Sequence, residues 1–192
     1  MSFIFNPCIT KNNEILTGLI EIYPKIYKDN RGYFFESYSQ RDFNESGINI
    51  SFVQDNQSNS SKGVLRGLHF QKKHSQGKLV RVINGEIFDV AVDLRYASET
   101  FGKWFSIILN DEKQNQFYIP PGFAHGFLVL SDKCIFTYKC TDFYYPEDES
   151  GIIWNDPSIG INWPNLGMDY ILSEKDKKLP LLLDYSFEDC KQ

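Results

Sequence analysis

Hydrophobic residues occur along this chain in short runs, many of which alternate with polar residues and end at turn-forming residues. Alternation with a period of two is typical of β-strands that have one buried face. The clearest pair of such segments covers residues 78–83 and 86–93, joined by Asn84-Gly85. Asn-Gly between two β-prone segments is the strongest short-range signal for a hairpin, because both turn residues take positive φ. The pattern therefore predicts an antiparallel hairpin here.

Further strands are predicted at many places along the chain: residues 15–23, 32–38, 50–55, 64–70, 101–109, 116–119, 126–130 and 135–139. So many short strands at close spacing predict an all-β fold, a sandwich or jelly roll of antiparallel strands. Two short helices are predicted, one over residues 40–46 and one that begins after an N-cap at Ser173 and ends before Pro180. With no repeat and no flexible linker, residues 1–192 are expected to form one domain.

One predicted strand carries a polar residue on an otherwise apolar face. Alternation along residues 86–93 places Asp89 on the same side as Ile87, Ala91 and Asp93. A carboxylate framed by apolar neighbours suits the inside of a barrel that holds a polar ligand. The 3 Trp, 11 Tyr and 16 Phe of the chain also fit a β-rich body or a site with aromatic walls.

Charge and cysteine content narrow the class of protein. The net charge of −5 gives no electrostatic footprint for nucleic acid. No apolar run approaches the ~18 residues of a membrane span, and the N-terminal residues lack the pattern of a signal peptide. The cysteines contain no C-x-x-C pair and are expected to be reduced thiols in a cytoplasmic protein: Cys8, Cys134, Cys140 and Cys190.

Two histidines lie in segments that resemble the two short motifs of the cupin superfamily. His69 ends the spacing that begins at Gly63, and His125 follows Pro120-Pro121-Gly122. Metal-binding cupins add a second histidine and a glutamate to the first motif. Here Gln71 takes the place of that histidine, no glutamate follows nearby, and His74 lies in a loop-like stretch. First-row metals need several His or carboxylate ligands in one sphere, so we expect no metal and no cofactor.

A cavity without a metal can still perform proton chemistry. A histidine titrates near pH 6.5, which makes His69 a natural general base. Tyr138 lies on a predicted strand and could point inward as a partner acid. Lys78 and Arg66 could hold an oxyanion or a phosphate. Taken alone, a single tyrosine on a strand is more often a packed core residue, and a lone histidine on a strand is more often structural.

Over nearly its whole length the chain resembles a metal-free cupin family, the dTDP-4-dehydrorhamnose 3,5-epimerases. The stretches that carry the resemblance are residues 29–37, 52–56, 64–71, 76–81, 85–93, 119–127, 138–142 and 154–156. The departures are small: Phe117-Tyr118 replaces a common Leu-Trp, and the loop at residues 72–75 differs. The resemblance implies epimerisation of C3 and C5 of dTDP-4-dehydro-6-deoxy-D-glucose to give dTDP-4-dehydro-L-rhamnose, a precursor of surface polysaccharide.

The resemblance also implies roles for individual residues. His69 matches the general base, Asp176 the carboxylate paired with it, and Tyr138 the general acid. Lys78 and His125 match residues near the C4 oxygen of the sugar, and Arg66 one that binds the diphosphate. The remaining matches are nucleotide-sugar contacts, some of them reached across the interface of a homodimer: Arg31, Glu36, Gln54, Asp55, Asn56, Glu149 and Lys175. Tyr144 and Asp89 match positions that line the pocket.

Other functions remain open on the sequence. One class comprises related enzymes, namely 3- or 5-epimerases, ketoisomerases, or epimerases of GDP-linked or heptose substrates. A second class is a non-enzymatic cupin that binds a sugar or nucleotide. Without the resemblance, Asp176 beside Lys175 and Lys177 would be interpreted as a solvated charge on a surface helix.

Overall fold

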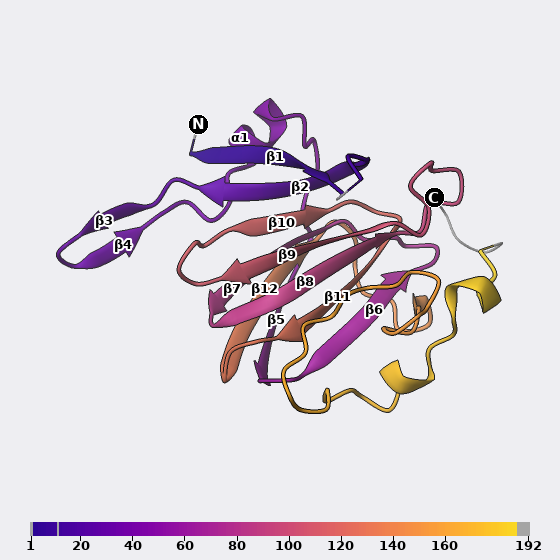
Figure 1. The fold of residues 1–192 in the computed structure, drawn as a ribbon. Coiled ribbons are helices and arrows are strands. Elements are labelled where there is room, and N and C mark those ends of the chain that lie inside the picture. The colour runs from indigo at the N-terminus through magenta and orange to yellow at the C-terminus, as the bar shows by residue number, and fades with distance from the viewer. Residues whose placement is uncertain (1, 11, 188–192) are drawn as a thin grey trace.

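The alternating segments form two antiparallel sheets (Figure 1), in a computed structural model that describes residues 2–10 and 12–187. The six-stranded sheet has the order β1 (Phe3–Ile9), β2 (Ile15–Pro24), β10 (Gln116–Ile119), β7 (Lys78–Asn84), β12 (Lys133–Cys140), β5 (Gln54–Ser61). The five-stranded sheet has the order β13 (Glu149–Gly151), β6 (Leu65–Gln71), β11 (Phe123–Val129), β8 (Glu86–Asp93), β9 (Trp104–Asn110). The predicted all-β, antiparallel class is confirmed.

A buried apolar cluster joins the two sheets. Val80 and Phe136 from the six-stranded sheet and Ile87 and Phe127 from the five-stranded sheet belong to it. A sheet with alternating residues buries one face, so two such sheets are stable when these faces pack together. Part of the space between the sheets is therefore filled by the apolar core. Where polar residues replace apolar ones, the same space can hold a ligand-binding site.

The outer faces of the sheets are covered by the two ends of the chain. The helix α1 (Gln40–Glu45) places Phe43 against Phe3 and Leu79 on the six-stranded sheet. The segment after β13, which includes the 3₁₀ turns η1 (Asp176–Lys178) and η2 (Leu182–Asp184), packs Ile152 and Leu182 on the five-stranded sheet. None of the helices in the described part of the chain is long and apolar enough to cross a membrane.

The predicted hairpin at Asn84-Gly85 is wrong. β7 pairs with β10 and β12, whereas β8 pairs with β11 and β9, so the chain passes from one sheet to the other at this point. Gly85 has φ +92°, and a Cβ there would collide with the Lys133 carbonyl oxygen and with Ser131 Oγ. Asn84-Gly85 thus forms the corner at which the chain passes between the sheets. This corner, like a hairpin turn, needs a residue with positive φ and no side chain, here Gly85.

Several predicted boundaries also change. Strand 32–38 shortens to β4 (Gly32–Phe34), which pairs with β3 (Tyr27–Asp29) in a hairpin that extends away from both sheets (Figure 1). Strand 50–55 begins only at Gln54, and β1 and β13 were not predicted. The second predicted helix is reduced to η1, although Ser173 Oγ does accept the Asp176 N–H at 3.0 Å. Leu179, the residue before Pro180, already has an extended backbone, so only one turn forms.

Candidate active site

A cavity of about 690 Å³ is lined by residues of both sheets. The structure brings most of the predicted site residues together on its walls: Gln54, Asn56, Arg66, His69, Lys78, His125, Tyr138, Tyr144, Glu149, Lys175 and Asp176. β5, β7 and β12 contribute from the six-stranded sheet, and β6, β11 and β13 from the five-stranded sheet. A ligand in the cavity would therefore be contacted from two opposite sides.

His69 and Asp176 form a close pair on one wall. The distance from His69 Nε2 to Asp176 Oδ1 is 2.5 Å, and Asp176 is only 3% exposed. Burial acts to raise the pKa of Asp176, but the hydrogen bond and charge of His69 hold it below its ordinary value. Asp176 is therefore not the solvated charge that its local sequence indicates, because η1 turns it inward against β6.

Tyr138 and Lys78 lie on adjacent strands of the opposite sheet. Tyr138 of β12 is paired with Val80, and Lys78 of β7 with Cys140. Directly paired residues share a face of a sheet, so Tyr138 faces the same side as Val80, which belongs to the core between the sheets. Lys78 lies two residues before Val80 on β7 and faces that side too. Both side chains thus reach the cavity. Burial raises the pKa of Tyr138 and lowers the pKa of Lys78, which keeps the phenol protonated and makes the ammonium easier to deprotonate.

A second histidine–carboxylate pair lies deeper in the wall. His125 Nε2 is 3.0 Å from both oxygens of Asp89, and Asp89 has no exposed surface. Burial raises the pKa of Asp89, while His125 and Lys78 act against that rise. His125 lines the cavity but Asp89 does not, so the lining position that the resemblance implies for Asp89 is not found.

The cavity mouth carries a group of linked polar side chains. Tyr144 donates its phenol proton to Glu149 Oε2 at 2.6 Å, and Lys175 Nζ lies 2.5 Å from the same oxygen. Burial acts to raise the pKa of Glu149, but these two partners hold it below its ordinary value. The same hydrogen bond raises the pKa of Tyr144 to about 12. Arg66 is exposed nearby and donates to Ser60 Oγ at 3.2 Å.

Three predicted contact residues lie outside the cavity lining. Arg31 and Glu36 are exposed on or just after the β3–β4 hairpin, and Arg31 pairs with Asp29 of the same hairpin at 2.5 Å. Asp55 alternates with Gln54 and Asn56 on β5, so its side chain faces outward and pairs with Lys139 at 3.0 Å. None of these three residues lines the cavity of its own chain.

Sequence reasoning assigned no role to several residues of the cavity. Ser58 and Phe136 could have been found by extending the period-two alternation from Asn56 and Tyr138 along their strands. Gln71 was noted only as a replacement for a metal ligand, yet it lines the cavity. The C-terminal residues Ile171 to Ser173 also line it, and no local signal predicts that a distant irregular segment would return to the site.

The ligands for a metal do not come together in the described residues. Residues 2–10 and 12–187 contain no group of three or more His, Cys, Asp or Glu side chains arranged to hold an ion. The amide of Gln71 is instead bonded to backbone groups of a neighbouring loop. Cys8, Cys134 and Cys140 are buried free thiols, and Cys190 lies outside the described residues.

Comparison with known proteins places these features in a family. The sequence model of the protein family described as dTDP-4-dehydrorhamnose 3,5-epimerase matches residues 13–184 of this chain. The curated dTDP-4-dehydrorhamnose 3,5-epimerase of Methanothermobacter thermautotrophicus is 59% identical over 163 residues, which cover 84% of this chain and 88% of the relative. The Pseudomonas aeruginosa protein of the same name is 56% identical over 156 residues, 81% of this chain and 86% of the relative.

A solved structure agrees with these sequences. The crystal structure of dTDP-6-deoxy-D-glucose-3,5-epimerase from Legionella pneumophila Philadelphia 1, in complex with dTDP-4-keto-L-rhamnose, superposes with a TM-score of 0.90. It is 50% identical in sequence, and the match covers 98% of each chain. The two-sheet architecture is the cupin jelly roll that the sequence motifs predict. This chain belongs to the dTDP-4-dehydrorhamnose 3,5-epimerase family.

Proposed function

We propose that this protein epimerises C3 and C5 of dTDP-4-dehydro-6-deoxy-D-glucose, giving dTDP-4-dehydro-L-rhamnose for surface polysaccharide synthesis. The observation that carries the proposal is the placement of a His69–Asp176 pair on one wall of a cavity and of Tyr138 and Lys78 on the other. A base and an acid on opposite sides of a bound sugar are what inversion of a carbon centre requires.

The keto group makes the chemistry possible. The C–H bonds at C3 and C5 are both adjacent to the C4 carbonyl, so removal of either proton gives an enolate with charge on the C4 oxygen. A fixed cation beside that oxygen stabilises the developing charge, and such a contribution is often the largest in the barrier. Lys78 supplies the cation, and Asp89 next to it favours its charged form. His125 of β11 adds a second polar group from the five-stranded sheet.

His69 and Tyr138 exchange the protons. His69 removes the proton from one face, and a positioned base of this kind accelerates proton transfer by roughly 10²–10⁴-fold. Asp176 fixes the ring of His69 and stabilises the imidazolium that forms. Tyr138, whose pKa is raised by burial, carries a proton to return to the opposite face. Because C3 and C5 flank one carbonyl, the same pair serves both carbons after the ring shifts, once His69 has released its proton to solvent and Tyr138 has taken one up.

The nucleotide part of the substrate is anionic at its diphosphate. Arg66 and Lys175 present cationic groups at the cavity lining, and an arginine fork matches phosphate oxygens in geometry. Gln54 and Asn56 of β5 add amide groups for hydrogen bonds. These four residues are the proposed nucleotide-sugar contacts that one chain supplies, together with Tyr144 and Glu149.

Solvent isotope exchange tests the catalytic proposal. In D₂O the protein with dTDP-4-dehydro-6-deoxy-D-glucose should incorporate deuterium at both C3 and C5, as read by NMR of the product. Label at C3 alone would reduce the function to a 3-epimerase. Saturable binding with no exchange by the folded protein would identify a non-enzymatic sugar-binding cupin instead. Parallel reactions with the GDP-linked substrate determine the nucleotide preference.

We also propose that the protein acts as a homodimer in which the β3–β4 hairpin completes the partner's cavity. The hairpin extends from the body, carries Arg31, and exposes Tyr33 and Phe34 to 57% and 68%. Large exposed aromatic side chains on a projecting element are typical of an interface. Such an arrangement would bring Arg31 of the hairpin, and Glu36 just after it, to a nucleotide in the partner's cavity.

Mixed subunits test the dimer. The inactive variants His69→Asn and Arg31→Ala are combined, dissociated and reassembled, so that some dimers hold one intact site. Recovery of activity above that of either variant supports a hairpin that crosses to the partner. A monomer in sedimentation equilibrium, or mixtures no more active than their components, would contradict the arrangement.

The cytoplasm is the proposed compartment. The buried free thiols of Cys8, Cys134 and Cys140 are compatible with a reducing environment, and the proposed nucleotide-sugar substrate is a cytoplasmic class of metabolite. Cell fractionation with an antibody to the protein tests this, and recovery in an extracytoplasmic fraction would contradict it.

A further inference from the structure

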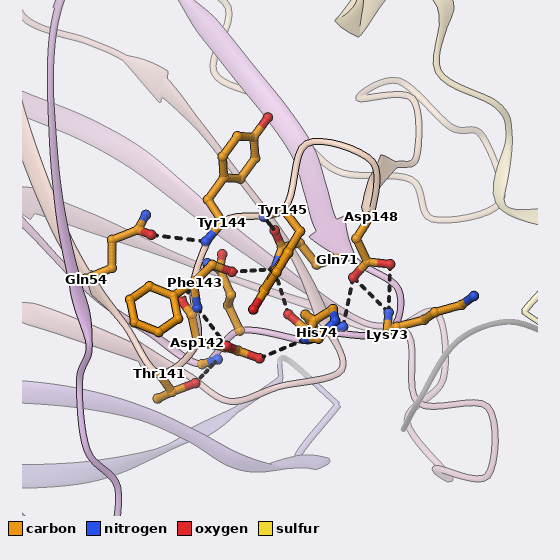
Figure 2. A network of polar contacts seen from close by, with 12 residues as sticks. Gln54, Gln71, Lys73, His74, Thr141, Asp142, Phe143, Tyr144, Tyr145 and Asp148 are labelled. Atoms are coloured by element: carbon orange, nitrogen blue, oxygen red, sulfur yellow. Dashed lines mark hydrogen bonds and ion pairs between the residues drawn. The ribbon is translucent and has the colours of Figure 1, made fainter.

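Gln71 occupies the place in the first cupin motif that a metal-binding histidine would take, and its side chain has a different task here. The residue ends β6 and is only 5% exposed. Its amide nitrogen donates to the Phe143 carbonyl oxygen at 3.0 Å and to the His74 carbonyl oxygen at 2.7 Å. Its amide oxygen accepts the Tyr145 N–H at 2.7 Å. One side chain thus holds two separate loops (Figure 2).

Two of these bonds flank a single cavity residue. Phe143 and Tyr145 are the neighbours of Tyr144, so the Gln71 amide fixes the backbone on both sides of it. The Tyr144 N–H itself is accepted by Gln54 Oε1 at 3.0 Å. The backbone of Tyr144 is therefore tied to the two strands β6 and β5, one from each sheet, although the residue lies in a loop.

The second loop reinforces the same arrangement. Asp148 accepts the N–H groups of Lys73 and His74, and the His74 ring stacks on the Tyr145 ring with centroids 4.0 Å apart. Figure 2 shows the side chains of both loops gathered around Gln71. Residues 72–75, where the sequence departs from the family pattern, are thus linked to the loop that presents Tyr144. Release of the Gln71 amide would loosen both loops at once.

The side chain that this device presents is part of the cavity wall. Tyr144 lines the cavity and donates to Glu149, which also pairs with Lys175. A displacement of the Tyr144 backbone would move its ring and break its hydrogen bond to Glu149. Groups that contact a substrate act efficiently only when neighbouring hydrogen bonds hold them within about 0.5 Å of the productive geometry.

We propose that Gln71 is a positioning residue for the proposed epimerase reaction, whose amide holds Tyr144 in the cavity wall by fixing the backbone on both sides of it. The inference rests on the proposed function for its kinetic consequence, but its structural part stands independently. It assigns a use to a position where related folds place a metal ligand: the amide, with two donors and an acceptor, meets three backbone groups that an imidazole could not satisfy.

A double-mutant cycle tests the link to Tyr144. Gln71→Ala alone should lower kcat/KM about tenfold, because the ring is no longer held in place. In a Tyr144→Ala background the same substitution should lower kcat/KM less than twofold, since the group it positions is gone. Equal losses in both backgrounds, or no loss in the single variant, would overturn the proposal.

Two further variants separate positioning from folding. Gln71→Glu keeps the size and the acceptor for the Tyr145 N–H but sets a carboxylate against two carbonyl oxygens, so it should lose activity as Gln71→Ala does. Asn115→Ala is the matched control, because Asn115 is a buried amide that bonds the backbone of Ile108 and Asn110 away from the cavity. An equal loss of kcat/KM in this control at equal thermal stability would show that the effect is not specific to Gln71.

Amide hydrogen exchange gives a readout that needs no activity. In the wild-type protein the Tyr145 N–H is protected by the Gln71 side chain, and in Gln71→Ala its exchange should be at least tenfold faster. Unchanged protection at Tyr145 would overturn the structural part. If the wild-type protein shows no epimerase activity but Tyr145 loses protection in the variant, the proposed function fails while the clamp by Gln71 stands.

Discussion

Two histidine–carboxylate pairs lie in the same molecule and differ in almost every property that matters for catalysis. The side chain of His69 is 30% exposed, whereas that of His125 is 9% exposed and its partner Asp89 is fully buried. Asp176 reaches His69 from 107 residues away in the chain, whereas Asp89 lies on β8, the strand next to His125 in the same sheet. The first pair has an open side toward the cavity, and the second belongs to its wall.

The pKa values of the two carboxyl groups end on opposite sides of the ordinary value, although burial acts to raise both. Burial is the largest influence on both, but the pKa of Asp176 ends below its ordinary value and that of Asp89 above it. A base needs a partner that keeps its charge and leaves one ring nitrogen free for the substrate. A His–Asp contact alone therefore does not define a catalytic dyad. The exposure of the ring, 30% for His69 against 9% for His125, and the direction of the pKa shift of the carboxyl partner distinguish the two.

The largest difference is expected when each histidine is replaced. His69→Asn should reduce kcat by roughly 10³-fold, because the proton-accepting nitrogen is lost. His125→Asn should reduce it about tenfold, because only a polar group near the C4 oxygen changes. Deuterium incorporation at C3 and C5 measures both, with circular dichroism as the check on folding. Equal losses in the two variants would remove the distinction between the pairs.

Replacement of the two carboxylates should also reduce kcat more at the His69 pair than at the His125 pair, but the losses should be smaller than those of the histidine variants. Asp176→Asn should lower kcat roughly 10²-fold, because the imidazolium of His69 loses its counter-charge and the ring its preferred tautomer. Asp89→Asn should lower kcat less than tenfold, since His125 can still bond to the amide oxygen. Steady-state kinetics under matched conditions give both values. A larger kcat loss in Asp89→Asn would make the buried pair the catalytic one.

The two pairs also show what sequence can and cannot predict. His69 and His125 could be predicted because each lies in a motif with fixed spacing on a strand. The register of the two strands then pairs His125 with His69. Asp176 was assigned only by resemblance, because a one-turn 3₁₀ segment has no periodicity to show which way it faces. The Asn84-Gly85 error has a similar cause. A local signal reports the need for positive φ at Gly85, but not whether the following strand returns to the same sheet.

Stability should show the reverse order of effects. Asp89→Ala leaves the buried His125 ring without its hydrogen-bond partner, which should cost about 2–3 kcal/mol in the free energy of unfolding. Asp176→Ala should cost about 1 kcal/mol, because the His69 ring it leaves can be hydrated from the cavity. Urea unfolding at pH 7 measures both. A smaller loss for Asp89→Ala would show that the deeper pair is not a structural element.

The smallest expected effect is a shift in pH dependence, and it connects the deeper pair to the reaction. Burial lowers the pKa of Lys78 and raises that of Tyr138, so we expect the ammonium to set the basic limb of kcat/KM. Activity then falls as pH rises through the Lys78 pKa. Asp89 favours the charged ammonium, so Asp89→Asn should move the limb to lower pH and add roughly a threefold loss under alkaline conditions.

Two variants make that shift specific. Lys78→Arg keeps its charge at every accessible pH, so its basic limb should move to higher pH even though the altered geometry lowers the overall rate. Asp176→Asn should leave the basic limb where it is, because the charge at Asp176 is not among the groups that act on Lys78. A limb that stays fixed in Lys78→Arg would belong to another group. If the basic limb moves equally in Asp89→Asn and Asp176→Asn, both carboxylates act on the Lys78 ammonium. The two His–Asp pairs would then not have separate roles as a catalytic base and as a part of the cavity wall.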